Sequence, residues 1–411
     1  MARPRALHIA PLAPARTGNG LAMRQGIFLE ALARVADTTL LLPLVPGAPS
    51  DLAAELGVRL EKVATAGRAD TRYTLLSRLA APAARLDAFR AYGRGSRHAA
   101  LSVPVLAELR ARFGAGGFDL VHAGRLYLAE AALAVAAPRT LDLDEDDAWV
   151  WQQQAARHRA AGNADAAAWA EAEAAAETRL LARAAPGFAA SFIAAPADRD
   201  RVAARHPGLS PEHIANGVPF PAAPRRRDDG RTLLFVGALG YGPNVAGLLW
   251  FAAHVLPLLA TTPASPRLVI VGRDAPPAIR ALAAHPHIEL AGALADVTPA
   301  YETATLALAP LLAGGGTRIK VIEAAAHLVP IVATTIGAEG LALDDTMLWR
   351  ADTPAGFAAA IREALADPEA RARRAHRARA HLRPFSDRAQ LVDALACRFE
   401  AIVAKAGAFP S

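Results

Sequence analysis

A glycine-rich turn followed by two cations is the strongest chemical signal in this chain of 411 residues. Three glycines, 314–316, follow an apolar strand pattern that ends at Pro310 and precede Thr317, Arg318 and Lys320. Glycines let the backbone approach a ligand closely, and the free N–H groups at the start of a helix attract an anion. The pattern predicts a diphosphate site, with Thr317 able to cap the helix. The alternative is a flexible turn with solvated cations.

Two further features favour the diphosphate site. Glu323 lies more than one turn into the same helical pattern, where its carboxylate could accept hydrogen bonds from the hydroxyl pair of a sugar or ribose. Lysine is also rare, because only three of the 45 basic residues are lysines. A lysine in this turn is therefore a notable choice.

The elements that must position this turn recur in the chain. Residues 7–10 form an apolar run, a loop with Gly18 and Gly20 follows, and residues 21–35 are amphipathic. Residues 232–236, the glycine turn at 237–242 and the helical pattern at 245–259 repeat this order. Strand, glycine turn and helix open a doubly wound α/β domain. Further continuous apolar runs alternate with helical stretches, which is typical of parallel sheets covered on both faces.

The sequence thus predicts an α/β protein with two Rossmann-like, doubly wound domains. A proline-rich segment that contains Pro219, Pro221 and Pro224 is the expected linker. The expected boundaries are 1–221 for the N-terminal domain and 228–385 for the C-terminal domain. A helix at 386–411 is expected to pack back toward the N-terminal domain.

The motifs of the second half resemble the group-1, or family 4, glycosyltransferases. The resemblance rests on the Gly-Gly-Gly-Thr-Arg-Ile-Lys-Val-Ile-Glu-Ala segment at 314–324, on 329–334 and 337–340, and on shorter matches at 216–218, 235–237, 243–244, 271–273 and 292–297. It implies a GT-B fold, in which two Rossmann-like domains face a cleft and the C-terminal domain holds most of the nucleotide sugar. It also implies a retaining, metal-independent transfer from a UDP- or GDP-sugar without a cofactor. The form with three glycines resembles transferases of exopolysaccharide systems.

The resemblance also implies site residues. Those expected to bind the donor are Gly18, Gly20, Gly237, Asn244, Arg273, Leu294, Gly315, Gly316, Thr317 and Glu323. Many relatives carry two glutamates eight positions apart; Glu323 fits the second, and the first falls on Gly315. Many relatives also place an Arg and a Lys after the opening glycine turn, where this chain has residues 240–244 instead. We therefore expect Arg318 and Lys320 to stabilise the leaving diphosphate as catalytic cations.

His122 is a third candidate for the catalytic site. It ends the apolar run at 119–122, and similar enzymes often place a histidine near this strand end to contact the transferred sugar. A shift of two residues in the alignment would put Gly124 there instead. A histidine that is merely satisfied at the end of a strand is the competing interpretation.

The acidic run from Asp142 to Asp147 leaves three interpretations open. It could face an acceptor, form a solvated loop that caps the helix entered at Trp149, or bind a divalent metal through Asp142 and Asp144. The cationic diphosphate site argues against the metal, so we expect no metal site.

Residues 68–98 contain seven arginines and two aspartates, with apolar and aromatic residues between them. This segment is either a solvated face or a basic surface for an anionic membrane or a lipid-linked acceptor. We expect the partners to be a nucleotide sugar and a glycan or lipid-linked acceptor, with peripheral contact to an anionic membrane as an open possibility.

Composition excludes several other classes. The net charge is +6 without a compact basic motif, so we expect no nucleic-acid partner. A single cysteine, Cys397, rules out an intrachain disulfide and fits a reducing compartment. No apolar run of about 18 residues is evident, and Pro11 and Pro14 interrupt any signal peptide. These features predict a cytoplasmic protein, peripheral at most on the inner face of the membrane.

The sequence therefore predicts a glycosyltransferase that moves a sugar from a nucleoside diphosphate sugar to a hydroxyl acceptor. Two alternatives stay open: a nucleotide-sugar epimerase of the same fold, and a non-catalytic subunit that binds a sugar nucleotide or a glycan. The missing first glutamate at Gly315 keeps the second alternative open.

Overall fold

The structure is a computed structural model that describes residues 3–18, 20–43, 49–61, 79, 81–92, 101, 103–259, 265–313 and 316–407. The chain forms two compact units. The N-unit comprises Met1–Ala15, Arg24–Ala215 and Val392–Ser411, and the C-unit comprises Arg16–Met23 and Asn216–Leu391. These limits differ from the expected domains in three respects: the C-unit begins before the proline-rich segment, it takes in the glycine loop 16–23, and it extends to Leu391 rather than to residue 385.

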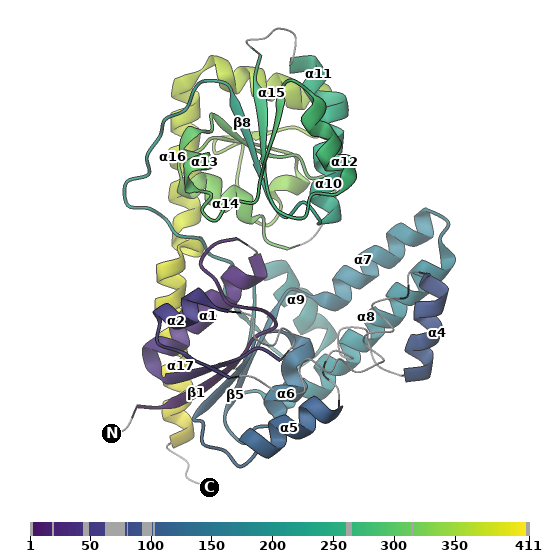
Figure 1. Cartoon of the computed structure of the whole chain (residues 1–411), viewed down its shortest axis with the longest axis vertical. Helices are drawn as coiled ribbons and strands as arrows, with labels where there is room; N and C mark the ends of the chain where they lie inside the picture. Colours follow the sequence, from purple (N-terminus) through teal and green to yellow (C-terminus); the bar gives the residue numbers. More distant parts are fainter. Residues whose placement is uncertain are drawn as a thin grey trace. The chain divides into compact units, whose positions relative to one another are not determined.

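The N-unit is built on a parallel sheet with strand order β3-β2-β1-β4-β5-β6-β7 (Figure 1). Its strands are β1 (Arg5–Ile9), β2 (Asp37–Leu41), β3 (Arg59–Glu61), β4 (Leu120–Ala123), β5 (Arg139–Asp144), β6 (Ala190–Ile193) and β7 (Glu212–His213). Strand β4 is buried along its whole length, β1 except at its first residue and β5 except at its two ends, as expected of strands covered on both faces of the sheet. The strand order reverses between β1 and β4, which makes their carboxyl ends the expected ligand edge.

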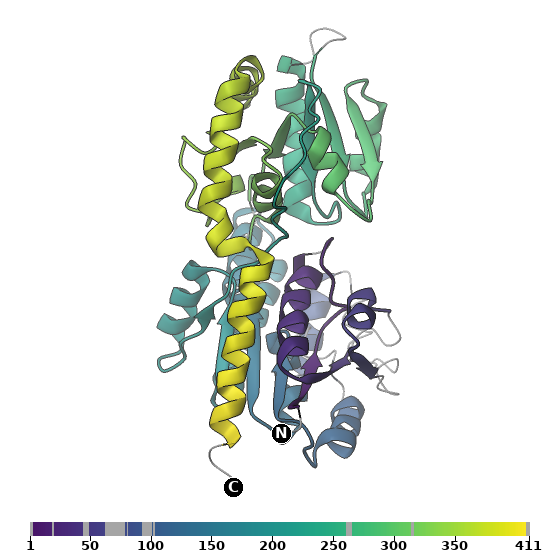
Figure 2. The ribbon, with the colours of Figure 1, turned by 90° about the vertical axis from the view of Figure 1, so that its left-hand side faces the viewer.

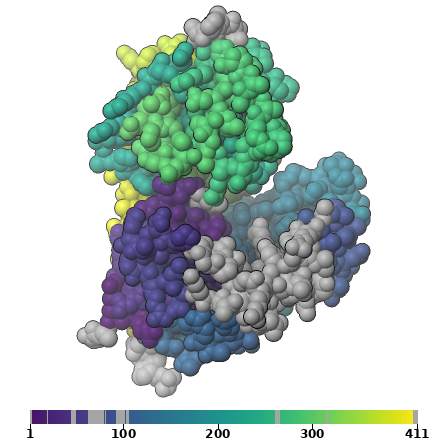
Figure 3. All heavy atoms as spheres, viewed as in Figure 1, coloured from purple at the N-terminus to yellow at the C-terminus, as the bar shows by residue number. Residues whose placement is uncertain are grey.

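Helices cover both faces of this sheet. They are α1 (Gly20–Val35), α2 (Asp51–Glu55), α4 (Pro82–Tyr92), α5 (Val103–Phe113), α6 (Ala129–Leu133), α7 (Asp147–Ala160), α8 (Ala164–Ala184), α9 (Pro196–Arg205) and α17 (Arg388–Gly407). Helices α7 and α8 pack against each other as a hairpin that projects from the N-unit, visible as an arm in Figures 1 and 3. Figure 2 shows α17, in yellow, along one face of the N-unit, where Phe399 meets Phe28 and Phe192 in the core.

The C-unit repeats the same architecture with strand order β10-β9-β8-β11-β12-β13. Its strands are β8 (Thr232–Val236), β9 (Arg267–Val271), β10 (Ile288–Gly292), β11 (Leu306–Ala309), β12 (Ile331–Ala333) and β13 (Trp349–Arg350). Its main helices are α10 (Gly242–Trp250), α11 (Leu256–Leu259), α12 (Pro277–Ala281), α13 (Thr298–Thr303), α14 (Ile319–Ala326), α15 (Pro354–Ala366) and α16 (Pro368–Ser386). The predicted α/β class with two Rossmann-like units is confirmed, and the strand order reverses here between β8 and β11.

The stretch Gly242–Leu259 is long and apolar enough on average to be a candidate membrane span, which the sequence analysis did not recognise. In the structure it runs from α10 to α11, and Leu248, Phe251 and Val255 lie in a hydrophobic cluster with the strands of the C-unit. Its apolar character is therefore explained by core packing.

Helix α10 approaches the loop after β11 so closely that only glycine fits at the contact. A Cβ at Gly247 would lie 2.4 Å from the carbonyl oxygen of Pro310, which is backbone and cannot swing away. This contact sets the distance between the first helix of the C-unit and the strand that leads to the glycine-rich turn.

Replacing Gly247 by Ala should destabilise the C-unit by about 1–3 kcal/mol, because the new methyl group overpacks a rigid contact. Gly242→Ala is the matched control, because Gly242 lies in the same helix and a Cβ there would have no neighbour within 4 Å. This variant should change stability by less than about 1 kcal/mol. Urea unfolding of both variants measures the difference. Equal stability of the two variants would contradict the close approach.

Candidate functional site

The carboxyl edge of the C-unit sheet brings the predicted donor residues together. Gly237 follows β8, and the loop after β11 leads through Gly316 to Thr317 and Arg318 at the start of α14. Strands β8 and β11 are neighbours with parallel register, so the two loops lie side by side at the point where the strand order reverses. Such a point is where open α/β sheets bind their ligands.

Lys320 is the cation at the centre of this edge. Its ammonium donates to Oδ1 of Asn244 over 2.7 Å, and it lies 4.1 Å from the centroid of the Phe235 ring. Asn244 is itself fixed, because its Nδ2 donates to the carbonyl of Ala238 over 2.8 Å. Gly237 completes the arrangement: a Cβ there would lie 2.9 Å from Nδ2 of Asn244 and 3.4 Å from the ammonium of Lys320.

The lowered pKa of Lys320 suits a site that could bind an anion. Desolvation, with a further contribution from the nearby Arg318, lowers the pKa of Lys320 to about 7. A bound diphosphate would favour the charged ammonium and raise that pKa. The amide oxygen of Asn244 and the face of the Phe235 ring favour the positive charge of the ammonium. The start of α14 favours an anion beside it.

Arg318 is engaged by backbone carbonyls and a carboxylate. Its side chain is only 4% exposed, and its guanidinium donates to the carbonyls of Ile336 (2.8 Å) and Gly316 (3.1 Å). It also pairs with the carboxylate of Glu339 at 3.1 Å. Arg318 therefore ties the end of the glycine-rich turn to the segment after β12. Its predicted direct contact with a diphosphate stays a prediction, and the geometry gives it a role in shaping the turn.

Thr317 is not the helix cap that the sequence suggested. Arg318 is the N-cap residue of α14 and forms no side-chain cap hydrogen bond, while the hydroxyl of Thr317 accepts from Nδ2 of Asn216 over 2.9 Å. Gly316 has φ +77°, a left-handed conformation that favours glycine. Gly315 lies outside the described residues. The turn thus depends on Asn216, a buried residue just before the proline-rich segment.

Glu323 lies almost fully buried in α14, one turn beyond Lys320. Oε2 accepts from the hydroxyl of Tyr301 over 2.9 Å. Burial raises the pKa of Glu323 to about 7, against the opposing effects of Tyr301 and Lys320. A carboxylate held in this way is suited to accept from a ribose or sugar hydroxyl, as the sequence analysis expected.

The remaining predicted donor residues lie around this edge of the C-unit. Arg273 follows β9, about half exposed, with its carbonyl accepting from the backbone N–H of Leu239. Leu294 is 41% exposed in the loop after β10. In the loop 16–23, Gly18 has φ +98°, and a Cβ at Gly20 would lie 2.7 Å from the Cδ1 atom of Ile319.

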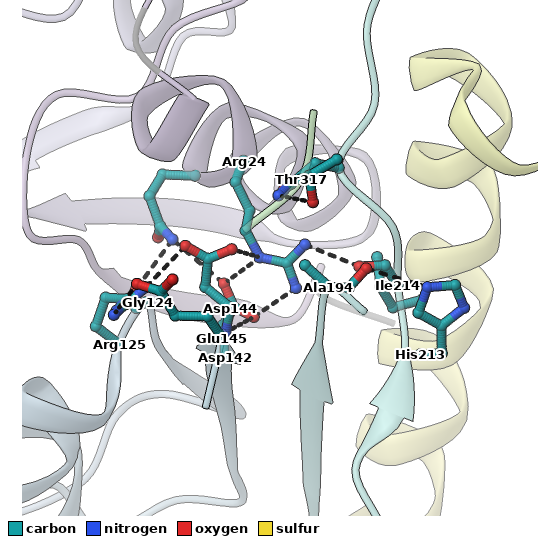
Figure 4. Close-up of polar contacts among 12 residues, drawn as sticks. Arg24, Gly124, Arg125, Asp142, Asp144, Glu145, Ala194, His213, Ile214 and Thr317 are labelled. Atoms are coloured by element: carbon teal, nitrogen blue, oxygen red, sulfur yellow. Dashed lines mark hydrogen bonds and ion pairs between the residues drawn. The ribbon is translucent and has the colours of Figure 1, made fainter. Parts of the chain in front are cut away.

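A buried ion network occupies the corresponding edge of the N-unit (Figure 4). Arg24 is 1% exposed and Asp142 fully buried; the guanidinium donates to both carboxylate oxygens at 2.7 Å. A third donation from Arg24 reaches the carbonyl of Ile214 at 2.8 Å. The network therefore joins the start of α1, the end of β5 and the segment after β7.

Arg125 extends this network from the end of β4. It donates to Asp144 at 2.7 Å, to Asp147 at 2.7 and 2.8 Å, and to Glu145 at 3.4 Å. Asp144 has φ +64° at an irregularity in the pairing of β5 with β6, so its backbone is held in a conformation that non-glycine residues seldom adopt. This arrangement turns the end of β5 toward Arg125.

The acidic run thus serves largely as a structural network. Asp146 accepts from the backbone N–H of Trp149 at 3.2 Å and caps α7, and Arg205 pairs with the same carboxylate at 2.8 and 3.0 Å. Among the described residues, no group of three or more His, Cys, Asp or Glu side chains could hold a metal ion. The expected cap of this helix is confirmed for Asp146, but the expectation of a solvated loop is wrong, because Asp142, Asp146 and Asp147 are buried.

His122 lies in the hydrophobic core of the N-unit. It is fully buried, its ring stacks on Phe28 at 4.3 Å, and its Nδ1 pairs with the hydroxyl of Thr140 at 2.9 Å. Burial holds the pKa of His122 well below its ordinary value, so the ring is neutral. A ring enclosed in this way packs the core and does not touch a sugar, which corrects the predicted catalytic role.

The basic segment 68–98 lies mostly outside the described residues. Within it, α4 is described, and Arg85 lies 4.9 Å from the centroid of the Trp169 ring. Leu86 and Phe89 are buried as α4 packs against α8. These side chains face the N-unit, and the predicted membrane contact stays a prediction.

Three important residues escaped the sequence analysis: Arg24, Asn216 and Tyr301. Each acts through a partner more than 20 residues away, so no local spacing indicated it. For Arg24 a signal did exist, because a dense acidic run at the end of a buried strand requires cations to neutralise it.

Comparisons with known proteins agree with this geometry. Residues 230–367 match the family described as glycosyl transferases group 1. Sucrose-phosphate synthase from Thermosynechococcus elongatus has a TM-score of 0.69 at 14% identity, covering 98% of this chain and 100% of that one. HepE of Anabaena in complex with UDP and glucose has a TM-score of 0.63 at 14% identity, and the match covers 97% of this chain and 100% of that one. Trehalose 6-phosphate synthase from Burkholderia multivorans has a TM-score of 0.64 at 15% identity, and the match covers 99% of this chain and 98% of that one. No curated protein sequence matches.

Removing one partner of the buried pair in the N-unit should be costly. Asp142→Asn leaves Arg24 buried without its full counter-charge, and such a loss typically destabilises by roughly 3–5 kcal/mol. Asp87→Asn is the control, because Asp87 pairs with Arg90 at 3.5 Å on the surface, and such pairs contribute roughly 0–1 kcal/mol. Urea unfolding at pH 7.5 checks both variants. A small effect at Asp142 would show that the network does not hold the N-unit together.

Proposed function

We propose that this chain, which carries a group 1 glycosyltransferase domain on a GT-B fold, transfers a sugar from a nucleoside diphosphate sugar to a hydroxyl acceptor. The observation that carries the proposal is the Lys320 ammonium, held between Asn244 and Phe235 beside the start of α14. This cation lies at the carboxyl edge of the sheet, where the strand order reverses.

Charge develops on the leaving diphosphate as the bond from the anomeric carbon to its β-phosphate oxygen breaks. Lys320 is placed to stabilise that charge, and preorganised donors of this kind supply large parts of a catalytic effect. The acceptor oxygen then bonds to the anomeric carbon on the face that the diphosphate leaves, and its proton passes to the leaving phosphate oxygen. Transfer with retention follows from this front-face route.

UDP is the first donor nucleotide to test, because HepE, which has the same fold, was crystallised with UDP and with UDP-glucose. Glu323 and the loops that carry Arg273 and Leu294 surround the proposed nucleotide site. Arg318 keeps the glycine-rich turn in shape through the carbonyls of Gly316 and Ile336.

The N-unit is proposed to offer the acceptor side, with a glycan, polysaccharide or lipid-linked sugar as the acceptor. Its carboxyl edge carries acidic groups already paired with arginines, so a neutral hydroxyl acceptor suits it. Polysaccharide synthesis on the cytoplasmic side, with peripheral contact to an anionic membrane, is part of the proposal.

The test is a donor panel with the purified chain. UDP-glucose, other UDP-sugars and GDP-sugars are offered with glycan acceptors, and we expect transfer with at least one donor. Activity should persist in EDTA, because Lys320 supplies the positive charge at the diphosphate. Loss of activity in EDTA with recovery in manganese would overturn the metal-independent part. Conversion of a donor without any acceptor would instead indicate an epimerase.

Lys320→Ala should lower turnover by about 100- to 1000-fold, the usual effect of removing one donor that stabilises a developing oxyanion. Lys405→Ala is the matched control, because Lys405 is exposed near the end of α17. Steady-state kinetics with the identified donor measures both. A change of less than threefold at Lys320 would remove its proposed role.

A further inference from the structure

Tyr301 is buried beside Glu323 and held in three ways. Its hydroxyl donates to Oε2 of Glu323 over 2.9 Å, and its ring stacks on His327, with centroids 5.2 Å apart and 1° between the planes. Its backbone carbonyl accepts from Arg226 at 2.8 Å. The side chain is 1% exposed, and its hydroxyl also lies 3.4 Å from the backbone carbonyl of Lys320, a longer contact than the one to Glu323.

This contact leaves Glu323 with one engaged oxygen and one oxygen for a ligand. Oε2 belongs to Tyr301, and within the described chain no hydrogen bond to Oε1 is present. A ribose presents two neighbouring hydroxyls, and a carboxylate with a fixed rotamer and a free oxygen binds them well. Without the Tyr301 hydroxyl, the Glu323 side chain would populate other rotamers, and ordering it on ligand binding would cost part of the binding free energy.

We propose that Tyr301 is the positioning residue that fixes the Glu323 carboxylate to bind the ribose of the nucleotide donor. The inference rests on the proposed donor site and adds the residue that orients it. Tyr301 comes from α13 and Glu323 from α14, so the arrangement depends on the packing of these two helices over the C-unit sheet.

Protonation gives this role a signature that a purely structural role lacks. Burial, strengthened by the Glu323 carboxylate, holds the pKa of Tyr301 well above its ordinary value, so the phenol stays a donor. Burial raises the pKa of Glu323 to about 7, and the hydrogen bond from Tyr301 opposes that rise. Removing the hydroxyl should raise the pKa of Glu323 further, so the carboxylate would form only at higher pH.

Several other titratable or charged groups face this pair and must be accounted for. Lys320 acts on Glu323 directly, and Arg318 acts on Lys320. His327 stacks on Tyr301 and is itself influenced by Asp296, Arg379, Glu302 and Arg226. All of them are retained when only the phenol oxygen is removed. A change in the pH profile of such a variant therefore reports on the contact between Tyr301 and Glu323.

The experiment compares Tyr301→Phe with the intact chain, because phenylalanine keeps the ring on His327. UDP, 2′-deoxy-UDP and inorganic pyrophosphate are titrated by calorimetry from pH 6 to 9. We expect UDP affinity at pH 7 to fall roughly tenfold, pyrophosphate affinity to stay within twofold, and the acidic limb of UDP binding to move to higher pH. In kinetics with the identified donor, KM should rise more than kcat falls.

Two further variants separate positioning from folding. Thr303→Val removes a hydroxyl that donates to the carbonyl of Pro299 in the same helix, and it should leave UDP binding unchanged. In Glu323→Gln, adding Tyr301→Phe should cost little more, because the two residues act through one contact. An equal loss for UDP and pyrophosphate would show a structural defect and overturn the proposal. Unchanged UDP affinity and an unchanged pH profile in Tyr301→Phe would overturn the positioning role of Tyr301 and leave the proposed function standing. An intact chain that binds no nucleotide would overturn both the positioning role and the proposed function.

Discussion

The proposed donor site depends on the placement of one ammonium taken out of water. Lys320 reaches the sheet edge from α14, and taking an ammonium out of water costs free energy unless polar partners replace the lost hydration. Asn244 supplies one acceptor at 2.7 Å and Phe235 supplies the negative face of its ring. These partners hold the cation without a full counter-charge, so in the proposed donor site a bound diphosphate would supply the negative charge.

The two sheet edges solve the problem of buried charge in opposite ways. In the N-unit, Arg24 and Arg125 meet the carboxylates of Asp142, Asp144, Glu145 and Asp147 directly, so the two buried guanidinium charges are neutralised within the protein. In the C-unit, Lys320 contacts an amide and a ring, and the carboxylate of Glu323 lies one turn further along the helix. The first arrangement holds strand ends in place, whereas the second suits an anionic ligand. The difference in function between the two edges follows from this difference in pairing.

The sequence predicted the architecture well because apolar strand runs and glycine turns are local signals. It also placed Lys320, Glu323 and Gly237 at one edge, since residues after parallel strands must meet there. It failed where partners come from distant segments. His122 was read as a site residue because the packing of Phe28 and Phe399 over it could not be seen in the sequence. Thr317 was read as a cap because Asn216, its actual partner, lies 101 residues away.

The departure from the usual family pattern has a physical consequence for three residues. When the diphosphate cation comes from α14 rather than from the turn after β8, that turn must leave room for it. A Cβ at Gly237 would lie 2.9 Å from Nδ2 of Asn244, which is too close, and 3.4 Å from the ammonium of Lys320, which is an ordinary contact. A cation in place of Asn244 would repel the ammonium. Gly237, Asn244 and Lys320 therefore form one unit, in which a change at one member disturbs another.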